Sequence, residues 1–169
     1  MIVCETPRLK IQHFVEQDAD FILELLNDRS FIENIGDKKL KTTEDAVNYL
    51  QAGPMASYKE FDFGLNLVIV KDSNLPIGMC GLVSREELEH SDLGFALLPK
   101  YWSKGYAKEA SIAVLKDGHE NHSLDLIQAI TAPSNKASNG LLRKLGFKFR
   151  GLIEYAGDTN NLYQYHFSK

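Results

Sequence analysis

Residues 97–107 read LLPKYWSKGYA, and this stretch decides how the rest of the sequence is interpreted. The apolar residues at its start predict the end of a strand, and the segment from Gly105 onward predicts the beginning of a helix. The first turn of a helix has unpaired N–H groups and the positive end of the helix dipole. Because Lys100, Lys104 and Lys108 make this turn locally basic, it suits either a bound diphosphate or a plain strand-to-helix turn.

A second stretch begins thirty residues after Gly105, where residues 135–147 read NKASNGLLRKLGF. Asn135 predicts the N-cap of another helix, and Gly146 predicts the end of that helix. Ser138 falls in the first turn. Taken alone, Asn135 is an ordinary cap and Ser138 is a capping or solvated hydroxyl.

Hydrophobic periodicity outside these stretches predicts a regular alternation of elements. Strands are expected at 8–14, 63–70, 76–84, 92–98, 126–131, 147–154 and 162–167. Helices are expected to begin at Asp18, Ser30 and Thr42, and to span 106–120 and 135–145, with Gly53–Pro54 breaking the third of them. The order β-α-α-β-β-β-α-β-α-β-β predicts an α/β (α+β) fold, with a mixed, mostly antiparallel seven-stranded sheet and helices on both faces. We expect one domain over 1–169, with its core at about 6–167.

Composition and charge exclude several classes of protein. The 169 residues include 19 Lys and Arg against 23 Asp and Glu, a net charge of −4 that argues against a nucleic-acid partner. The apolar runs are too short to span a membrane, and the first ten residues do not form a secretory signal. Cys4 and Cys80 show no disulfide or metal spacing, so we expect no metal site and a reducing, cytoplasmic location.

The two stretches together resemble the GNAT acetyltransferase superfamily. Its acyl-CoA loop has the form Q/R-x-x-G-x-G/A, which residues 102–107 match except that Trp102 stands at the Gln/Arg position. Four features of the sequence are similar to the branch of ribosomal-protein alanine N-acetyltransferases. They are Trp102 at the Gln/Arg position, the N-x-x-S motif at Asn135, the later Leu-Gly-Phe and the opening Glu5-Thr-Pro-Arg-Leu. The resemblance extends from about Thr6 to Phe167.

The resemblance implies acetyl-CoA as co-substrate and a primary amine, on a protein N-terminus or a small molecule, as acceptor. The cofactor would lie in a V-shaped gap between the strands ending at Leu98 and starting near Leu126. The residues implied in cofactor binding are Leu97, Trp102, Ser103, Lys104, Gly105, Tyr106, Ala107 and Asn135. The amine would attack the thioester directly, without an acyl-enzyme, and Cys80 is expected to be a core thiol. We expect a monomer or a homodimer.

The groups that move protons are less defined by the sequence. Many GNAT proteins have a tyrosine four residues before the Gly-Phe pair, whereas Leu142 stands here, and Ser138 is the substitute by position. Asp92 is the first candidate for the general base, acting through water, and Glu86 and Glu87 are alternatives. Two other functions stay open: an acyl-CoA sensor without turnover, and a nucleotide-binding transferase. The second lacks a G-x-x-x-x-G-K-[ST] motif.

Overall fold

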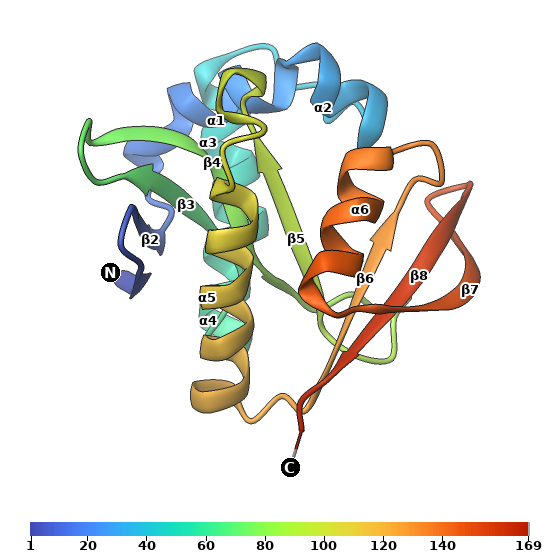
Figure 1. Cartoon of the computed structure of the whole chain (residues 1–169). Helices are drawn as coiled ribbons and strands as arrows, with labels where there is room; N and C mark the ends of the chain where they lie inside the picture. The colour runs from blue at the N-terminus through green and yellow to red at the C-terminus, as the bar shows by residue number, and fades with distance from the viewer. Residues whose placement is uncertain (169) are drawn as a thin grey trace.

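The computed structural model describes residues 1–168 of the chain as an eight-stranded sheet with helices packed on both faces (Figure 1). The strands lie in the order β1-β2-β3-β4-β5-β6-β8-β7. They are β1 (Ile2–Glu5), β2 (Leu9–His13), β3 (Leu65–Val70), β4 (Leu75–Val83), β5 (Asp92–Leu97), β6 (Leu126–Thr131), β7 (Lys148–Tyr155) and β8 (Asp158–His166). The helices are α1 (Ala19–Asn27), α2 (Arg29–Asn34), α3 (Thr43–Leu50), α4 (Ala56–Phe61), α5 (Tyr106–His122) and α6 (Lys136–Leu145).

The sheet is mixed, as the sequence predicts, but it has one strand more than expected. Among the described strands, only β5 and β6 are parallel neighbours, and the other pairs are antiparallel. The additional strand is β1, which pairs with β2 across an irregularity between Ile2 and Cys4. Its four residues are too few to show the alternation that identifies a strand in a sequence.

Each face of the sheet has its own hydrophobic core. Alternate residues of β3 and β4 point to opposite faces, so Val68 and Cys80 join one core whereas Leu67 and Met79 join the other. Helices α5 and α6 cover the first core, and the helices from α1 to α3 cover the second. The two buried faces fix the register of the central strands, because a slip of one residue would exchange the faces.

The expectation that Gly53–Pro54 breaks the third helix is wrong. The chain passes from α3 through one π-helical turn, Gln51–Met55, directly into α4. A proline removes one N–H donor and clashes with the carbonyl one turn back in an α-helix. The wider π turn relieves that clash, so Pro54 is buried within a continuous helical column.

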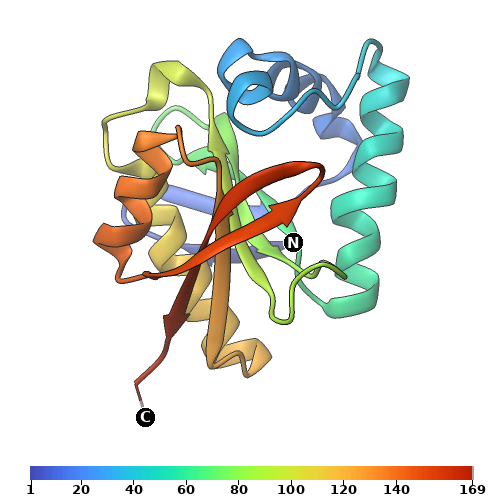
Figure 2. The same ribbon diagram turned by 90° about the vertical axis from the view of Figure 1, so that its right-hand side faces the viewer.

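The parallel pair in the middle of the sheet separates soon after it begins. The only residues in register between β5 and β6 are Asp92 and Gln128. The amide of Gln128 donates to the carbonyl of Ser91 at 2.9 Å, and beyond this point the strands diverge. The β7–β8 hairpin projects from the sheet toward the column formed by α3 and α4 (Figure 2). The fold therefore has a V-shaped gap that is closed at Asp92 and open toward the loop after β5.

Candidate cofactor and acceptor site

Backbone groups of β5 face the V-shaped gap. The carbonyl of Ser91 points toward β6 and the amide of Leu98 donates to Ile77 of β4 at 2.9 Å. Because strand backbone groups alternate in direction, Phe95 and Leu97, which lie beyond the Asp92–Gln128 register pair, direct their N–H and C=O groups into the gap. These groups can pair with an extended ligand as a neighbouring strand would.

The loop after β5 ends in an αL residue that starts helix α5. Gly105 is the N-cap with φ of +82°, and Ser103 also has a positive φ, of +62°. The N–H groups of Tyr106, Ala107 and Lys108 lie in the first turn of a 17-residue helix and have no partner within it. Backbone of this kind forms a concave set of N–H donors that suits an anion. The diphosphate expected from the sequence thus fits the residues present.

Trp102 has a defined contact that the sequence did not reveal. Its indole Nε1 donates a hydrogen bond to the carbonyl of Leu97 at 2.9 Å, while the ring remains 45% exposed. This contact ties the loop to the end of β5. It also occupies one lone pair of the Leu97 carbonyl, so the N–H of Leu97 is the freer of its two backbone groups.

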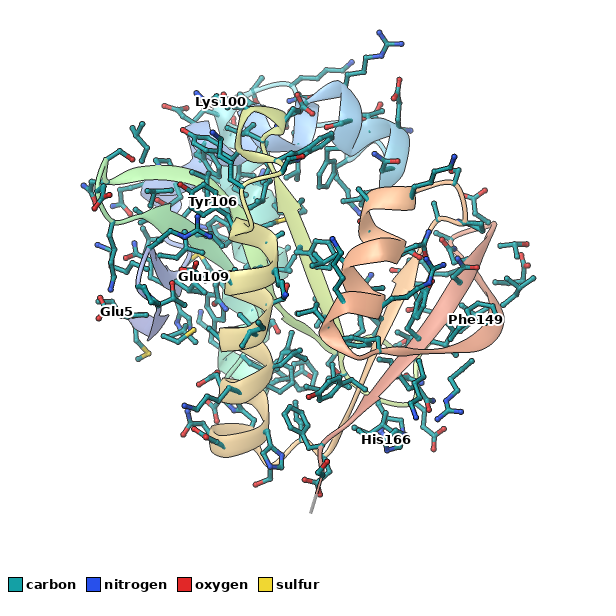
Figure 3. All side chains as sticks on the ribbon, in the orientation of Figure 1. Glu5, Lys100, Tyr106, Glu109, Phe149 and His166 are labelled. Atoms are coloured by element: carbon teal, nitrogen blue, oxygen red, sulfur yellow. The ribbon has the colours of Figure 1, made fainter. Side chains whose placement is uncertain are left out.

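Sequence analysis missed a set of contacts that holds the loop in place, here called the Arg8 clamp: Thr6, Arg8 and Glu109. Arg8 donates from Nε to Glu109 Oε1 at 2.8 Å and from Nη1 to the carbonyl of Lys104 at 2.9 Å. Its guanidinium lies 4.4 Å from the ring centroid of Tyr106. Thr6 donates its hydroxyl to Glu109. Figure 3 shows Tyr106 and Glu109 on the side of α5 that faces the N-terminal strands.

The clamp also sets the charge of its carboxylate. Burial alone would raise the pKa of Glu109, but hydrogen bonds from Thr6 and Arg8 outweigh it and lower that pKa. Glu109 is therefore ionised at neutral pH and keeps Arg8 beside the loop. The Glu5-Thr-Pro-Arg-Leu opening signalled the family resemblance, and the structure gives it a physical role.

Asn135 and Ser138 lie where the sequence predicts them, at the first turn of α6. Asn135 is the N-cap, and its Oδ1 accepts from the amide of Ser138 at 3.2 Å. Buried Asn139 anchors the same turn, because its Oδ1 accepts from Thr131 at 2.5 Å and from Tyr163 at 2.8 Å. The capping role of Asn135 leaves its Nδ2 group available to a ligand.

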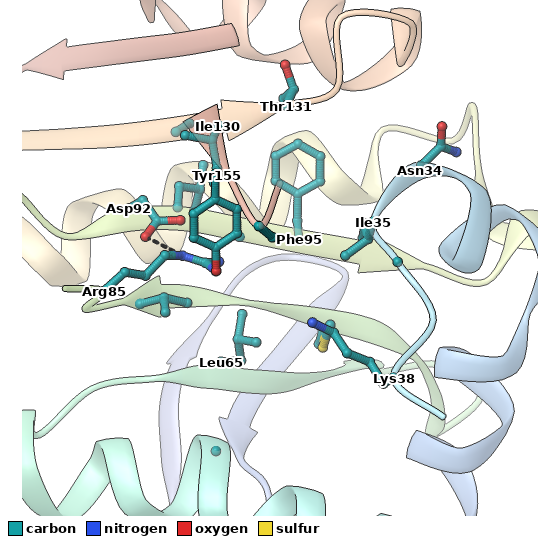
Figure 4. Close-up of a pocket in the computed structure, with 18 of the residues that line it drawn as sticks. Asn34, Ile35, Lys38, Leu65, Arg85, Asp92, Phe95, Ile130, Thr131 and Tyr155 are labelled. Atoms are coloured by element: carbon teal, nitrogen blue, oxygen red, sulfur yellow. Dashed lines mark hydrogen bonds and ion pairs between the residues drawn. The ribbon is translucent and has the colours of Figure 1, made fainter. Parts of the chain in front are cut away.

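A cavity of about 900 Å³ opens beside the gap (Figure 4). Three of the residues selected from the sequence line it: Asp92, Asn135 and Ser138. Residues 102–107 are not part of its lining and lie at the opposite end of β5. The remaining walls come from the segment after α2, the α3–α4 column and the β7–β8 hairpin. The gap and the cavity together provide one binding region with two ends.

Asp92 is held at the closed end of the gap by an ion pair. It is 1% exposed, and its Oδ1 accepts from Arg85 Nε at 2.9 Å. Burial raises the pKa of Asp92, and the charge of Arg85 opposes that effect without cancelling it. Burial alone would lower the pKa of Arg85, but Asp92 and Tyr155 outweigh it and raise that pKa. Arg85 and Tyr155 are cavity residues that the sequence did not single out.

The other positions considered from the sequence offer no reactive side chain to the cavity, although Leu142 contributes apolar surface to its wall. Glu86 and Glu87 are exposed and do not line it. Leu142, at the position of the family tyrosine, is a fully buried core residue. Cys80 is 1% exposed, and burial raises the pKa of its thiol to about 12. A thiol of this kind is a poor nucleophile at neutral pH.

Within 1–168, no group of three or more His, Cys, Asp or Glu side chains could hold a metal ion. No helix of this part of the chain is long and apolar enough to cross a membrane.

The gap, the basic loop and the adjoining cavity have the shape and charge that suit a transferase with an extended, anionic acyl donor and a separate acceptor. A family model described as acetyltransferase (GNAT) domain matches residues 8–148. The chain belongs to the GNAT acetyltransferase family and uses acetyl-CoA as its acetyl donor. The resemblance inferred from the sequence is confirmed.

Known relatives cover nearly the whole chain. The uncharacterized N-acetyltransferase YoaA of Bacillus subtilis is 27% identical over 154 residues, or 89% of this chain and 85% of that protein. An acetyltransferase (GNAT family) from Bacillus anthracis is 25% identical, with a TM-score of 0.80 and 98% of each chain covered. RimL, a ribosomal L7/L12 alpha-N-protein acetyltransferase solved in complex with coenzyme A, is 16% identical, with a TM-score of 0.83 and 98% of each chain covered.

Proposed function

We propose that the protein acetylates a primary amine, on a protein N-terminus or a small molecule, by direct attack of the amine on the acetyl-CoA thioester. The observation that carries this proposal is the gap with free backbone groups that continues into a cavity. In the reaction a C–N bond forms and the C–S bond breaks. The amine loses a proton and the departing thiolate gains one.

The cofactor half of the site is assigned to the end of β5, the loop that follows it, and the N-terminal turns of α5 and α6. Backbone amides of Ser103 to Ala107 hold the diphosphate, with Lys104 adding positive charge, and Trp102 fixes the loop. The N–H of Leu97 and the Nδ2 group of Asn135 bind the pantetheine arm. Support comes from the positive φ angles at Ser103 and Gly105 and from the unpaired amides of α5.

Proton transfer is assigned to Asp92 and Ser138, the two residues chosen from the sequence for this role, and both line the cavity. Asp92 accepts the amine proton through water, because its carboxylate is buried and ion-paired at the closed end of the gap. Ser138 donates to the departing thiolate from the first turn of α6. Direct transfer agrees with the thiols, since burial also raises the pKa of Cys4, to about 11, and neither cysteine is activated.

RimL, named as acting on ribosomal L7/L12, makes a protein N-terminus one of the possible acceptors. Two free cysteines fit the cytoplasmic location expected from the sequence.

The test is release of free thiol from acetyl-CoA by the purified chain, measured with a panel of amines. General-base catalysis contributes about 10²- to 10⁴-fold, so Asp92→Asn should lower kcat and alter the acidic limb of the pH–rate profile. Ser138→Ala should lower kcat with the acidic limb retained. Binding of acetyl-CoA without thiol release from any amine would instead identify an acyl-CoA sensor. Stabilisation by ATP rather than acetyl-CoA would identify a nucleotide site.

A further inference from the structure

Two cationic side chains enter the cavity from opposite sides. Arg85 follows β4, and Lys38 lies on the segment between α2 and α3. Both extend toward the space beside Leu65 and Phe95 (Figure 4). The two strand residues form an apolar floor, so an ionic group that enters here meets charge only from the sides.

Arg85 is fixed in position with one edge of its guanidinium unused. Nε donates to Asp92, Nη1 donates to the hydroxyl of Tyr155, and the guanidinium lies 5.1 Å from the Tyr155 ring centroid. Within the described residues, Nη2 has no hydrogen-bond partner, and the side chain is 26% exposed. A guanidinium held in this way loses little further freedom when it binds an anion.

Lys38 approaches this position without a partner of its own. No carboxylate of residues 1–168 lies within 4.0 Å of its ammonium group. Partial burial and the charge of Arg85 both lower the pKa of Lys38, which indicates that the two cations repel each other. An anion between them would remove that repulsion.

The remaining acidic groups of the cavity do not fill this role. Glu33 pairs with Arg29 on the surface of α2 at 2.8 Å. Glu60 and Asp158 are exposed, at the ends of α4 and the β7–β8 hairpin respectively. The positive charges of Arg85 and Lys38 are therefore available to an anionic group of a ligand.

We propose that the acceptor is a primary amine that also carries a carboxylate, and that Arg85 and Lys38 bind this carboxylate. The inference rests on the acetyl transfer proposed above and specifies its acceptor. With the carboxylate held at the cations, the amine lies toward the gap, where Ser138 and Asn135 line the same cavity. A free amino acid and a peptide N-terminus followed by an acidic side chain both have this chemistry.

The experiment compares amines that differ in one charge. Thiol release from acetyl-CoA is measured with L-alanine against L-alaninamide, with the peptide amides Ala-Glu-NH₂ against Ala-Gln-NH₂, and with putrescine. Because an amide-bearing amine is less basic and more of it is deprotonated, chemical reactivity alone favours alaninamide. We expect kcat/KM for the carboxylate-bearing member of one pair to exceed its neutral partner by about 10- to 100-fold, as charge-assisted hydrogen bonds provide. The pair that responds distinguishes an amino acid from a peptide.

Matched variants test the assignment to Lys38. Lys38→Gln should reduce the ratio of kcat/KM for the preferred carboxylate-bearing amine to that for its neutral partner by about tenfold. Lys39→Gln, an exposed neighbour that does not line the cavity, is the control and should leave this ratio unchanged. Equal or better turnover of amides or putrescine, or a carboxylate preference that persists in Lys38→Gln, would overturn this inference while acetyl transfer stands. No thiol release with any amine would overturn both.

Discussion

The Arg8 clamp should control cofactor affinity from outside the cofactor site, and Arg8→Ala tests this. The variant loses a partly exposed ion pair, worth up to about 1 kcal/mol, and a hydrogen bond to the Lys104 carbonyl, worth about 1 kcal/mol. It also loses the contact with the Tyr106 ring, worth about 0.5 kcal/mol. After allowance for the 44% exposure of Arg8, the total is about 2 kcal/mol.

This energy converts into two measurable changes. A loss of about 2 kcal/mol lowers the Tm of a chain of this size by about 4–8 °C. The part of the energy that orders the loop appears in binding, so calorimetry should show a Kd for coenzyme A raised by about 5- to 30-fold. Arg29→Ala is the matched control, because it removes an ion pair of the same 2.8 Å length within helix α2.

Glu109→Gln distinguishes two roles of Glu109: holding Arg8 beside the loop, and acting directly on the anionic cofactor through its negative charge. The substitution removes a negative charge near the loop, so an effect of charge alone would tighten binding of the anionic cofactor. Loss of the carboxylate that holds Arg8 should instead weaken it. Unchanged affinity in Arg8→Ala, or tighter binding in Glu109→Gln, would refute the reasoning.

Three further predictions concern the gap and its two ends. Gly105→Asp should weaken acetyl-CoA binding at least tenfold by calorimetry, since it places charge and bulk at the helix start. Gly157→Asp has nearly the same φ, +83° against +82°, so it controls for backbone strain and should leave affinity unchanged. Asn135→Asp keeps the capping oxygen but not the Nδ2 donor, so it should raise the KM for acetyl-CoA with little loss of Tm, whereas Asn135→Ala should also cost about 1 kcal/mol of stability. Burial raises the pKa of Asp92, so the stability that its protonated form contributes is lost as pH rises through that pKa. The Tm advantage of the wild type over Asp92→Asn should therefore shrink from about pH 4 upward, and an advantage that grows would mean that the Arg85 pair dominates.

Local patterns in the sequence were sufficient for most elements and for the turn that leads from β5 into α5. The helix beginning at Gly105 and the N-cap at Asn135 each depend on neighbouring residues, and the structure contains both. The π turn at Gly53–Pro54 was missed because proline normally ends a helix, and burial of Pro54 overrides that preference here.

Contacts between distant segments could not be predicted in the same way. Arg8 and Glu109 are 101 positions apart, and no pattern within either segment points to the other. The acceptor end of the cavity likewise combines Lys38, Arg85 and Tyr155 from three separate segments. Asp92 was selected as the general base, a role that stays a prediction. The structure places it in the wall of the cavity, and its pairing with Arg85 could not be read from the sequence.

The single register pair between β5 and β6 has a consequence for the motions of the protein. Strands β1–β5 and β6–β8 form two half-sheets whose ladders meet only at Asp92 and Gln128, so they can open as separate cooperative units. An extended ligand that pairs with the backbone on both sides of the gap would join those units. Amide hydrogen exchange should then slow at Phe95 and Ile130 when coenzyme A binds, and the half-sheets should unfold together instead of one after the other.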